Sequence, residues 1–327
     1  MENNTNVKQI ADLIVNSNSI LITVHESPDG DAVGSMLALA GMLEFMNKKV
    51  TMYSPDVIPT KLRFLNKWNK IETETKNIND FDLMIMLDCG DRARSGRYIT
   101  SFKGYKKLIN IDHHVSNDAF GDFNYIDPKV SSTAEHVYAL VKELLTRTGM
   151  SKMPEYIATC ILAALYDDTG GMRYISTTSK TLNIAADLVD SGANCSNVSE
   201  NLFFSVSREK MELTSRVLTT LTFEKQGQIA YMMMQISDLE ATGAFAEDSE
   251  GLIDFPRAIY GVEVAFLIKE VEKNKFKLSF RSRGKVDVND FCSRFGGGGH
   301  KVAAGCTIKG ELKEIIKNVV SQLKELL

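Results

Sequence analysis

The chain has 327 residues, of which 44% are hydrophobic and 24% are charged, and its formal net charge at pH 7 is −4. This length corresponds to about two domains, and the net negative charge excludes a broad basic surface that coats duplex nucleic acid. A small phosphorylated ligand held in one local pocket is compatible with the same charge.

Targeting and membrane-spanning signals are not expected in this sequence. The N-terminus, Met1 to Asn4, lacks the basic start and apolar core of a signal peptide. The longest apolar stretches, such as residues 157–166, are far shorter than the roughly 18 residues that a membrane span needs. The five cysteines are odd in number and form no C-x-x-C pair, so neither a disulfide framework nor a zinc ribbon is expected. We expect a cytoplasmic protein with reduced thiols.

The first half of the chain alternates strand-like and helix-like segments. Three apolar runs predict strands, and each is followed by an acidic or histidine residue: 19–24 by His25, 81–87 by Asp88, and 107–111 by Asp112. Residues 33–46 have helical apolar spacing. Continuous apolar strands separated by helices predict a parallel sheet that is covered on both faces. In such sheets ligands bind outside the carboxyl ends of the strands, so these side chains are expected to share one site.

The remaining elements complete the predicted architecture. A helix is expected over 132–147, opened by the capping box Ser132-Thr133-Ala134-Glu135, and another begins at Pro154. Strand-like segments and a final amphipathic helix follow near the end of the chain: strands at 228–235, 262–270 and 276–283, and the helix at 312–326.

These patterns predict an α/β protein with two domains. Residues 1–190 would form an N-terminal parallel-sheet domain with helices on both faces. Residues 191–221 are helical and polar and predict a connector, and residues 222–327 would form a smaller α+β domain that binds substrate.

The first chemical motif is His25-x-x-x-Asp29-x-Asp31, directly after a predicted strand. Pro28 and Gly30 mark a tight turn, and Asp29 and Asp31, two residues apart on extended backbone, can each reach toward a metal ion. The alternative is that the aspartates only form the turn and cap the following helix. Together with the other motifs, the metal-binding interpretation is favoured.

Three further groups favour the same site. Asp88 ends an apolar strand, where an uncompensated carboxylate is costly to bury; a satisfied carboxylate near solvent is the alternative. The neighbours His113 and His114 point to opposite faces of extended backbone, so one is expected on metal and the other toward substrate, unless they lie in a surface loop. Asp167 and Asp168 follow an apolar helix, where acidic residues are unfavourable unless a cation is present or the helix simply ends there.

A glycine run from 296 to 299, followed by His300, is the last motif. It lies between apolar segments, which argues against a flexible linker. Consecutive glycines let backbone N–H groups approach phosphate closely, and Arg281, Arg283 and His300 would add charge-assisted donors. His136 stands alone on a predicted helix and is expected to be structural.

Taken in order, the motifs resemble those of the DHH phosphoesterase family: His25-x-x-Pro28-Asp29-x-Asp31-x-x-Gly34-Ser35, Asp88, Asp112-His113-His114, and Asp168-Thr169-Gly170. The run from Gly296 to His300, with Arg281, resembles that family's type 1 associated substrate-binding domain. The resemblance covers nearly the whole chain.

The resemblance implies a site for two divalent metal ions, usually Mn²⁺. One ion would be held by His25, Asp29 and Asp88. The second would be held by Asp31, Asp88, His113 and Asp168, so that Asp88 bridges the two. Asp88 and His114, the latter beside the scissile phosphate, would be the catalytic residues. The implied substrate-binding residues are Arg281, Arg283, Gly297, Gly298, Gly299 and His300.

The implied activity is that of a metal-dependent phosphoesterase, which hydrolyses short oligonucleotides (nanoRNA or dinucleotides) to mononucleotides and removes phosphate from pAp. A phosphodiesterase for cyclic or linear signalling dinucleotides would share every motif, and a manganese pyrophosphatase would share the first domain. A non-enzymatic nucleotide-binding sensor would be expected to have lost some metal ligands. The expected partners are short oligonucleotides, pAp or dinucleotides, without long duplexes or membranes. The ranking of substrates and a homodimeric state are left open.

Overall fold

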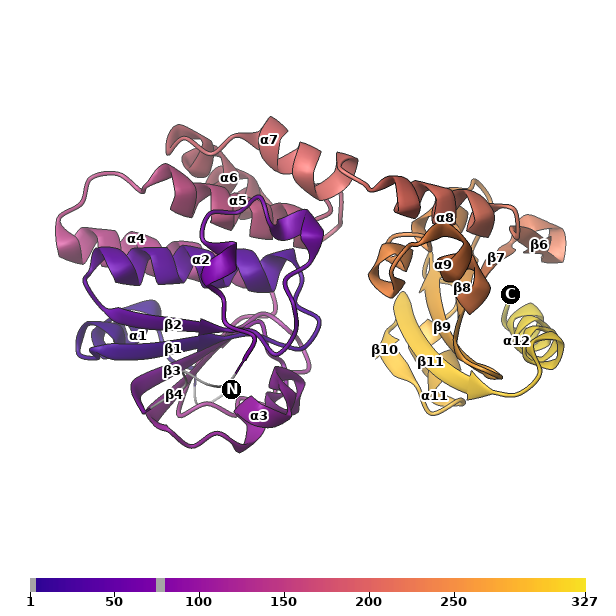
Figure 1. The fold of residues 1–327 in the computed structure, drawn as a ribbon, viewed down its shortest axis with the longest axis horizontal. Helices are drawn as coiled ribbons and strands as arrows, with labels where there is room; N and C mark the ends of the chain where they lie inside the picture. Colours follow the sequence, from indigo (N-terminus) through magenta and orange to yellow (C-terminus); the bar gives the residue numbers. More distant parts are fainter. Residues whose placement is uncertain (1–3, 75–79) are drawn as a thin grey trace. The chain divides into compact units, whose positions relative to one another are not determined.

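The structure is a computed structural model that describes residues 4–74 and 80–327 (Figure 1). The residues before position 4, considered above for a signal peptide, therefore lie outside the described part. The chain divides into two units, Met1–Ser205 and Val206–Leu327, each with its own hydrophobic core. The division falls inside the predicted connector of residues 191–221.

The N-terminal unit is built on a five-stranded parallel sheet. Its strands are β1 (Ser19–Thr23), β2 (Lys49–Tyr53), β3 (Phe81–Leu87), β4 (Tyr105–Asp112) and β5 (Phe123–Ile126), in the order β2-β1-β3-β4-β5. The three predicted strands are confirmed as β1, β3 and β4. The next strand in sequence, β2, lies on one side of β1, and all later strands of this sheet lie on the other side. A crevice is therefore expected beyond the carboxyl ends of β1 and β3, where the strand order reverses.

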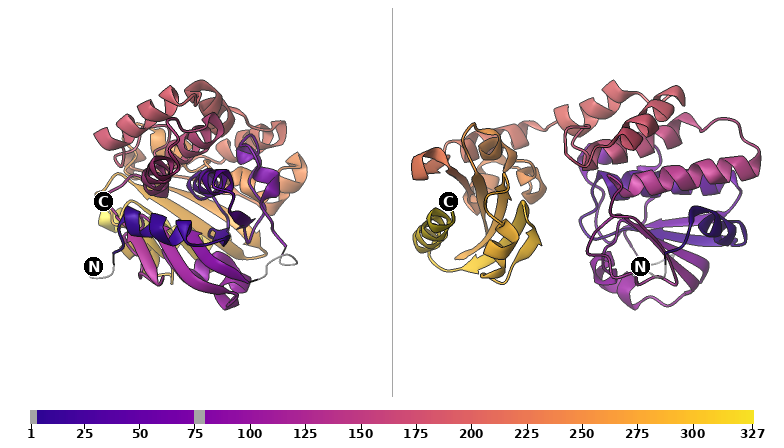
Figure 2. Two further views of the ribbon diagram at one scale, coloured as in Figure 1. Left: turned by 90° about the vertical axis from the view of Figure 1, so that its left-hand side faces the viewer. Right: turned by 180° about the vertical axis from the view of Figure 1, so that it is seen from behind.

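Helices cover both faces of this sheet, as the sequence predicts. On one face lie α1 (Val7–Val15), α2 (Gly30–Phe45) and α4 (Thr133–Thr148), and α5 (Glu155–Asp168) and α6 (Ser179–Asp190) pack outside them (Figures 1 and 2). The short helix α3 (Gly96–Ser101) covers the other face through Ile99, which packs against Leu21, Met84 and Met86. Helix α7 (Cys195–Ser199) contributes Val198 to the main core.

Helix α2 is buried on all sides between the sheet and α5. It begins at Gly30 rather than at Val33, so the prediction that Asp31 lies on extended backbone was wrong. Gly34 faces α5 so closely that a Cβ atom there would lie 2.5 Å from the carbonyl oxygen of Cys160 and 2.9 Å from the Cβ of Ala164. The missing side chain lets the two helices approach, and both helices carry residues of the site described below.

The C-terminal unit is an α+β domain, as expected. Its sheet has the order β10-β11-β9-β8-β7-β6, formed by β6 (Thr222–Glu224), β7 (Ile229–Met234), β8 (Val264–Glu272), β9 (Lys275–Ser282), β10 (Gly298–His300) and β11 (Ala303–Lys309). Only the β7–β8 pair is parallel among these described strands. One face packs on α11 (Val288–Ser293) and α12 (Leu312–Leu326). The other face packs on α8 (Arg208–Leu218) and on the segment with α9 (Ile236–Thr242) and α10 (Asp254–Ala258).

Within residues 4–74 and 80–327, no helix is both long and apolar enough to cross a membrane.

The close approach of α2 and α5 generates a stability prediction. Gly34→Val should lower the free energy of unfolding by about 2–3 kcal/mol or more, because the added atoms overlap the backbone of α5. Urea denaturation measures this loss. Ala186→Val, at an exposed position of α6, adds the same β-branched side chain to a helix without a clash and should cost only about 0.6 kcal/mol. Equal losses in the two variants would contradict the packing argument.

Candidate metal centre

The predicted metal ligands come together at the carboxyl end of the parallel sheet. His25 follows β1, Asp88 follows β3, and His113 follows β4, while the other ligands come from helix ends: Asp29 and Asp31 from the start of α2 and Asp168 from the end of α5. Their ligand atoms form overlapping groups, each within 4.8 Å: His25, Asp29 and Asp88; Asp31, His113 and Asp168; Asp88, His113 and His114. Side chains from His25 to Asp168, far apart in sequence, therefore surround one small volume.

Asp88 belongs to two of these groups and shares one of them with His113, which belongs to the third. Its carboxylate is buried, with one oxygen 3.4 Å from Nε2 of His25 and the other 3.6 Å from Nε2 of His113. The second oxygen also accepts a hydrogen bond of 2.9 Å from the hydroxyl of Thr133. The backbone at Asp88 has φ of +57°, a left-handed conformation that is uncommon for non-glycine residues but that aspartate tolerates better than most. The two oxygens thus face two different ligand groups, as a bridging carboxylate requires.

Asp29 combines the two roles that the sequence left as alternatives. It is the N-cap of α2, where its carboxylate accepts a 3.0 Å hydrogen bond from the N–H of Ala32. The same Oδ1 atom lies 3.8 Å from Nε2 of His25. Capping therefore fixes the side chain beside His25, and the two interpretations do not exclude each other.

Asp31 lies in the first turn of α2 and joins that helix to α4. Its carboxylate accepts hydrogen bonds from the N–H groups of Thr133 (2.6 Å) and Ala134 (2.9 Å). These are among the first amides of α4, which have no partner within their own helix. The carboxylate of a candidate metal ligand therefore caps a second helix, and the start of α4 holds it in place.

The predicted capping box of α4 was wrong, although the helix itself is confirmed. Ser132 makes no side-chain cap hydrogen bond. The Glu135 carboxylate instead accepts hydrogen bonds of 2.8 Å from the hydroxyls of Ser131 and Thr181. Asp31 already occupies the position of a capping acceptor, so the local motif is overridden by a tertiary contact.

The two neighbouring histidines have different surroundings. Nε2 of His113 lies 3.3 Å from the Asp168 carboxylate, within a candidate ligand group. Nδ1 of His114 is hydrogen-bonded to Asp112 at 2.8 Å, which leaves its Nε2 for another partner. Asn117, which the sequence analysis missed, donates to the other oxygen of Asp112 at 2.5 Å. The hydrogen bond that His114 donates to the Asp112 carboxylate raises the pKa of His114.

The carboxylates of the site repel one another unless a cation is bound. Burial, followed by the nearby carboxylates of Asp88 and Asp29, raises the pKa of Asp168 to about 8. Burial and the carboxylates of Asp88 and Asp168 also raise the pKa of Asp31. Burial alone would lower the pKa of His25, but its hydrogen bonds to Asp29 and Asp88 outweigh this and raise the pKa to about 10. A divalent cation would relieve this repulsion, and carboxylate and imidazole donors suit such an ion.

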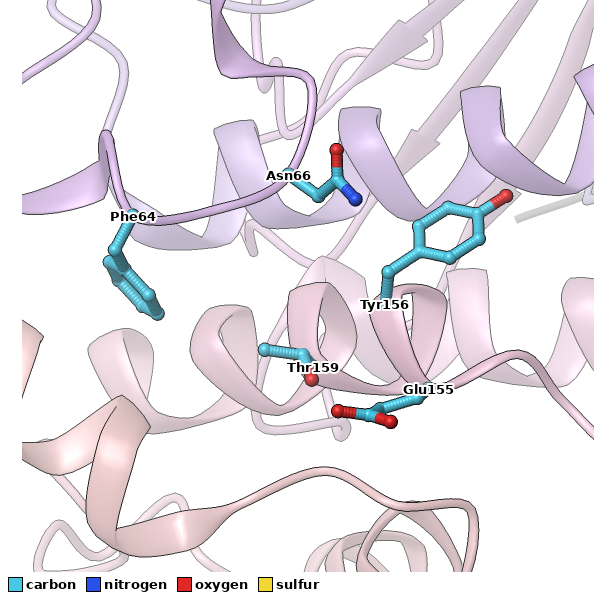
Figure 3. A pocket seen from close by; sticks show the side chains of 5 residues that line it. All are labelled: Phe64, Asn66, Glu155, Tyr156 and Thr159. Atoms are coloured by element: carbon cyan, nitrogen blue, oxygen red, sulfur yellow. The ribbon is translucent and has the colours of Figure 1, made fainter.

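A cavity of about 330 Å³ lies elsewhere in the N-terminal unit. Figure 3 shows its lining: Phe64, Asn66, Glu155, Tyr156 and Thr159. Glu155, Tyr156 and Thr159 lie at the start of α5, a helix of 14 residues that is about 20 Å long, whereas Asp168 ends it. The cavity contains none of the predicted ligands and is separate from the candidate metal centre.

In the C-terminal unit, Arg281 and His300 lie on the same face of the sheet. Ala303 of β11 is paired with Arg281 on one side and with His300 on the other, so the two side chains flank it. In the next row of this face, Gly305 is paired with Gly298 on one side and with Ser279 on the other. The sheet surface between Arg281 and His300 therefore carries only small residues.

The glycine run and Arg283 are placed differently from the expectation. The N–H groups of Gly296, Gly297 and Gly299 donate to groups of the preceding segment, namely Ser293 O, Cys292 O and Asn289 Oδ1. They are therefore not an open cradle for phosphate. A Cβ atom on Gly297 would lie 2.2 Å from the carbonyl oxygen of Gly305, so glycine is required by close packing. The Arg283 guanidinium donates to the carbonyls of Val262 (2.9 Å) and Arg257 (3.2 Å) and braces that loop.

Comparison with known proteins identifies the family. Residues 19–165 match the DHH family, N-terminal domain, and residues 226–325 match the DHHA1 domain. The chain belongs to the DHH family, which confirms the resemblance seen in the motifs.

Two curated relatives carry the same name, bifunctional oligoribonuclease and PAP phosphatase NrnA. The chain is 31% identical to the protein from Thermus thermophilus, over 94% of this chain and 89% of that one. It is 26% identical to the protein from Bacillus subtilis, over 94% and 95%. A crystal structure of an exopolyphosphatase-related protein from Bacteroides fragilis matches the fold with a TM-score of 0.89 at 26% identity, covering 98% of this chain and 96% of that one.

Proposed function

We propose that the protein is a metal-dependent phosphoesterase that hydrolyses short oligonucleotides to mononucleotides and removes phosphate from pAp. The observation that carries this proposal is that the buried carboxylate of Asp88 belongs to two of the three ligand groups and that His113 links it to the third. Membership of the DHH family and the names of the two curated relatives support the same activity.

Two divalent cations fit the arrangement of the ligands. We assign the first to His25, Asp29 and Asp88, and the second to Asp31, Asp88, His113 and Asp168. The four carboxylates match the charge of two divalent ions, so an anionic phosphate is not repelled. When bound, such a pair of ions supplies Lewis-acid activation of water and stabilises the charge that develops at the phosphate.

The protein's own groups hold and orient this centre. Thr133 fixes one oxygen of Asp88, and the start of α4 fixes Asp31 through two backbone amides. Asp112 holds Nδ1 of His114, and we assign the remaining nitrogen, Nε2, to a phosphate oxygen of the substrate. These contacts would position the reacting groups before the substrate arrives.

We assign substrate binding to the sheet face of the C-terminal unit that carries Arg281 and His300. The guanidinium of Arg281 would bind phosphate, and the small residues Ala303, Gly305 and Gly298 would allow a nucleotide to lie close to the backbone. Gly297 and Gly299 shape the same hairpin, and Arg283 would contribute mainly by bracing the adjacent loop.

The identity of the metal and the cellular compartment belong to the same proposal. Mn²⁺ is the metal that the family resemblance implies, and oxygen and imidazole donors suit it. All five cysteines are unpaired thiols, which fits the reducing conditions of the cytoplasm.

Removal of Asp88 tests the metal-dependent mechanism. Asp88→Asn preserves the shape and tolerates the left-handed backbone, yet it should lower kcat on pAp and on RNA dinucleotides by at least about 10²–10³-fold, because the shared negative charge is lost. A ladder of labelled RNAs of 2 to 10 nucleotides, assayed beside pAp, should show turnover by the unmodified protein, reversible loss with a chelator, and recovery with Mn²⁺.

Asp82→Asn is the matched control, because Asp82 lies at the other end of the same strand and pairs with Lys106. It should leave turnover unchanged. Full activity of Asp88→Asn, or activity that survives chelation, would overturn the mechanism. Turnover confined to signalling dinucleotides would replace the proposed substrates.

His300→Ala tests the assignment of the C-terminal unit. The loss of one charge-assisted hydrogen bond should raise KM for a dinucleotide by about 10-fold or more, with a smaller effect on kcat. Lys301→Ala changes the next exposed residue and serves as the control. Steady-state kinetics with unchanged KM and kcat for His300→Ala would remove this residue from the substrate site.

A further inference from the structure

Helix α5 ends in two adjacent aspartates whose side chains go to different places. Asp168 joins the ligand group that contains Asp31 and His113. The carboxylate of Asp167 instead accepts a hydrogen bond of 2.7 Å from the backbone N–H of Gly30. Its other oxygen lies 3.1 Å from Nζ of Lys61, which comes from the short helix Thr60–Leu62. The end of α5 thus contributes both a candidate ligand, Asp168, and a hydrogen-bond acceptor for the backbone of the first motif, Asp167.

The clamped amide belongs to the residue between two candidate ligands. Gly30 separates Asp29 from Asp31, and these two aspartates belong to different ligand groups. A Cβ atom on Gly30 would lie 2.5 Å from Cβ of Asp167 and 2.8 Å from its Oδ2. The carboxylate therefore packs directly against the backbone that sets the directions of both ligands.

Lys61 compensates the negative charge of Asp167, which is unfavourable at the end of α5. Asp167 lies near Asp29, and its helix C-terminus carries the negative end of the helix dipole. Its side chain is 14% exposed, and without a partner such a carboxylate would be costly to bury. The ammonium of Lys61 offsets this cost, so the charged carboxylate stays in place as the acceptor for Gly30.

We propose that Asp167 and Lys61 are positioning residues of the metal centre, which hold the Gly30 amide and thereby the spacing of Asp29 and Asp31. This inference rests on the proposed function, since it assigns these aspartates to metal ions. Neither positioning residue is among the candidate ligand groups. Their effect is therefore expected on metal affinity, with no direct contribution to substrate binding.

The test measures Mn²⁺ binding by calorimetry together with the Mn²⁺ concentration that gives half-maximal activity. Lys61→Met and Asp167→Ala should each weaken Mn²⁺ binding by about 10–100-fold, the usual effect of losing a group that orients metal ligands. At saturating Mn²⁺, KM for pAp should stay within about 2-fold of the unmodified protein. Asp167→Asn keeps an acceptor for Gly30 but loses the ion pair, so its effect should be intermediate, and Lys61→Arg should restore most of the affinity.

Lys67→Met is the matched control. Lys67 forms a similarly exposed ion pair with Glu44 near the other end of α2, so its loss should leave Mn²⁺ binding unchanged. Unchanged Mn²⁺ affinity in Lys61→Met, or an equal loss in Lys67→Met, would overturn the proposal. If Asp167→Ala does not fold, the Mn²⁺ affinities of Lys61→Met and Lys61→Arg test the proposal. Absence of turnover in the unmodified protein would refute the phosphoesterase proposal, whereas calorimetry would still test the positioning of the metal ligands.

Discussion

The structure depends on holding several carboxylates close together at one end of a buried parallel sheet. Asp88 stands at the centre of this arrangement, buried and on left-handed backbone, and Asp29, Asp31 and Asp168 surround it. Their mutual repulsion must be offset by hydrogen-bond donors, by histidines and by cations. Many elements of the N-terminal unit provide these donors and histidines.

The helices around the site contribute in opposite ways. Helices α2 and α4 begin there, so their free amides and the positive ends of their dipoles favour carboxylates such as Asp29 and Asp31. Helix α5 ends there, and its two terminal aspartates are opposed by its own dipole. This helix is held close to α2 by the glycine contact at Gly34, and its unfavourable charges are offset by Lys61 and, in the proposed mechanism, by metal ions.

Much of the fold and most of the candidate site could be predicted because the signals are local. The strands β1, β3 and β4 are continuous apolar runs, and each is followed at once by a chemical motif. Strands β2 and β5 were missed because they lie at the edges of the sheet and are not continuous apolar runs: Lys49 and Thr51 interrupt β2, and Asn124 interrupts β5. Pro28 and Gly30 indicated a turn, yet the helix begins at Gly30, because the Asp29 side chain caps it there.

Other features depend on tertiary contacts that a local sequence pattern does not show. The capping box at Ser132 follows a sound local rule, but Asp31, which is 102 residues away from Thr133, supplies the acceptor. The pairing of Lys61 with Asp167 spans 106 residues and leaves no pattern in a single sequence. The glycine run was interpreted through its amides, whereas three of these amides donate to α11 and close packing explains the missing side chain at Gly297.

The central claim is that Asp88 joins two metal ions in one centre, and anomalous diffraction from crystals grown with Mn²⁺ tests it most directly. The account predicts two anomalous peaks about 3.5–4 Å apart, with the Asp88 carboxylate in contact with both. A single peak, or two peaks of which Asp88 contacts only one or neither, would contradict it.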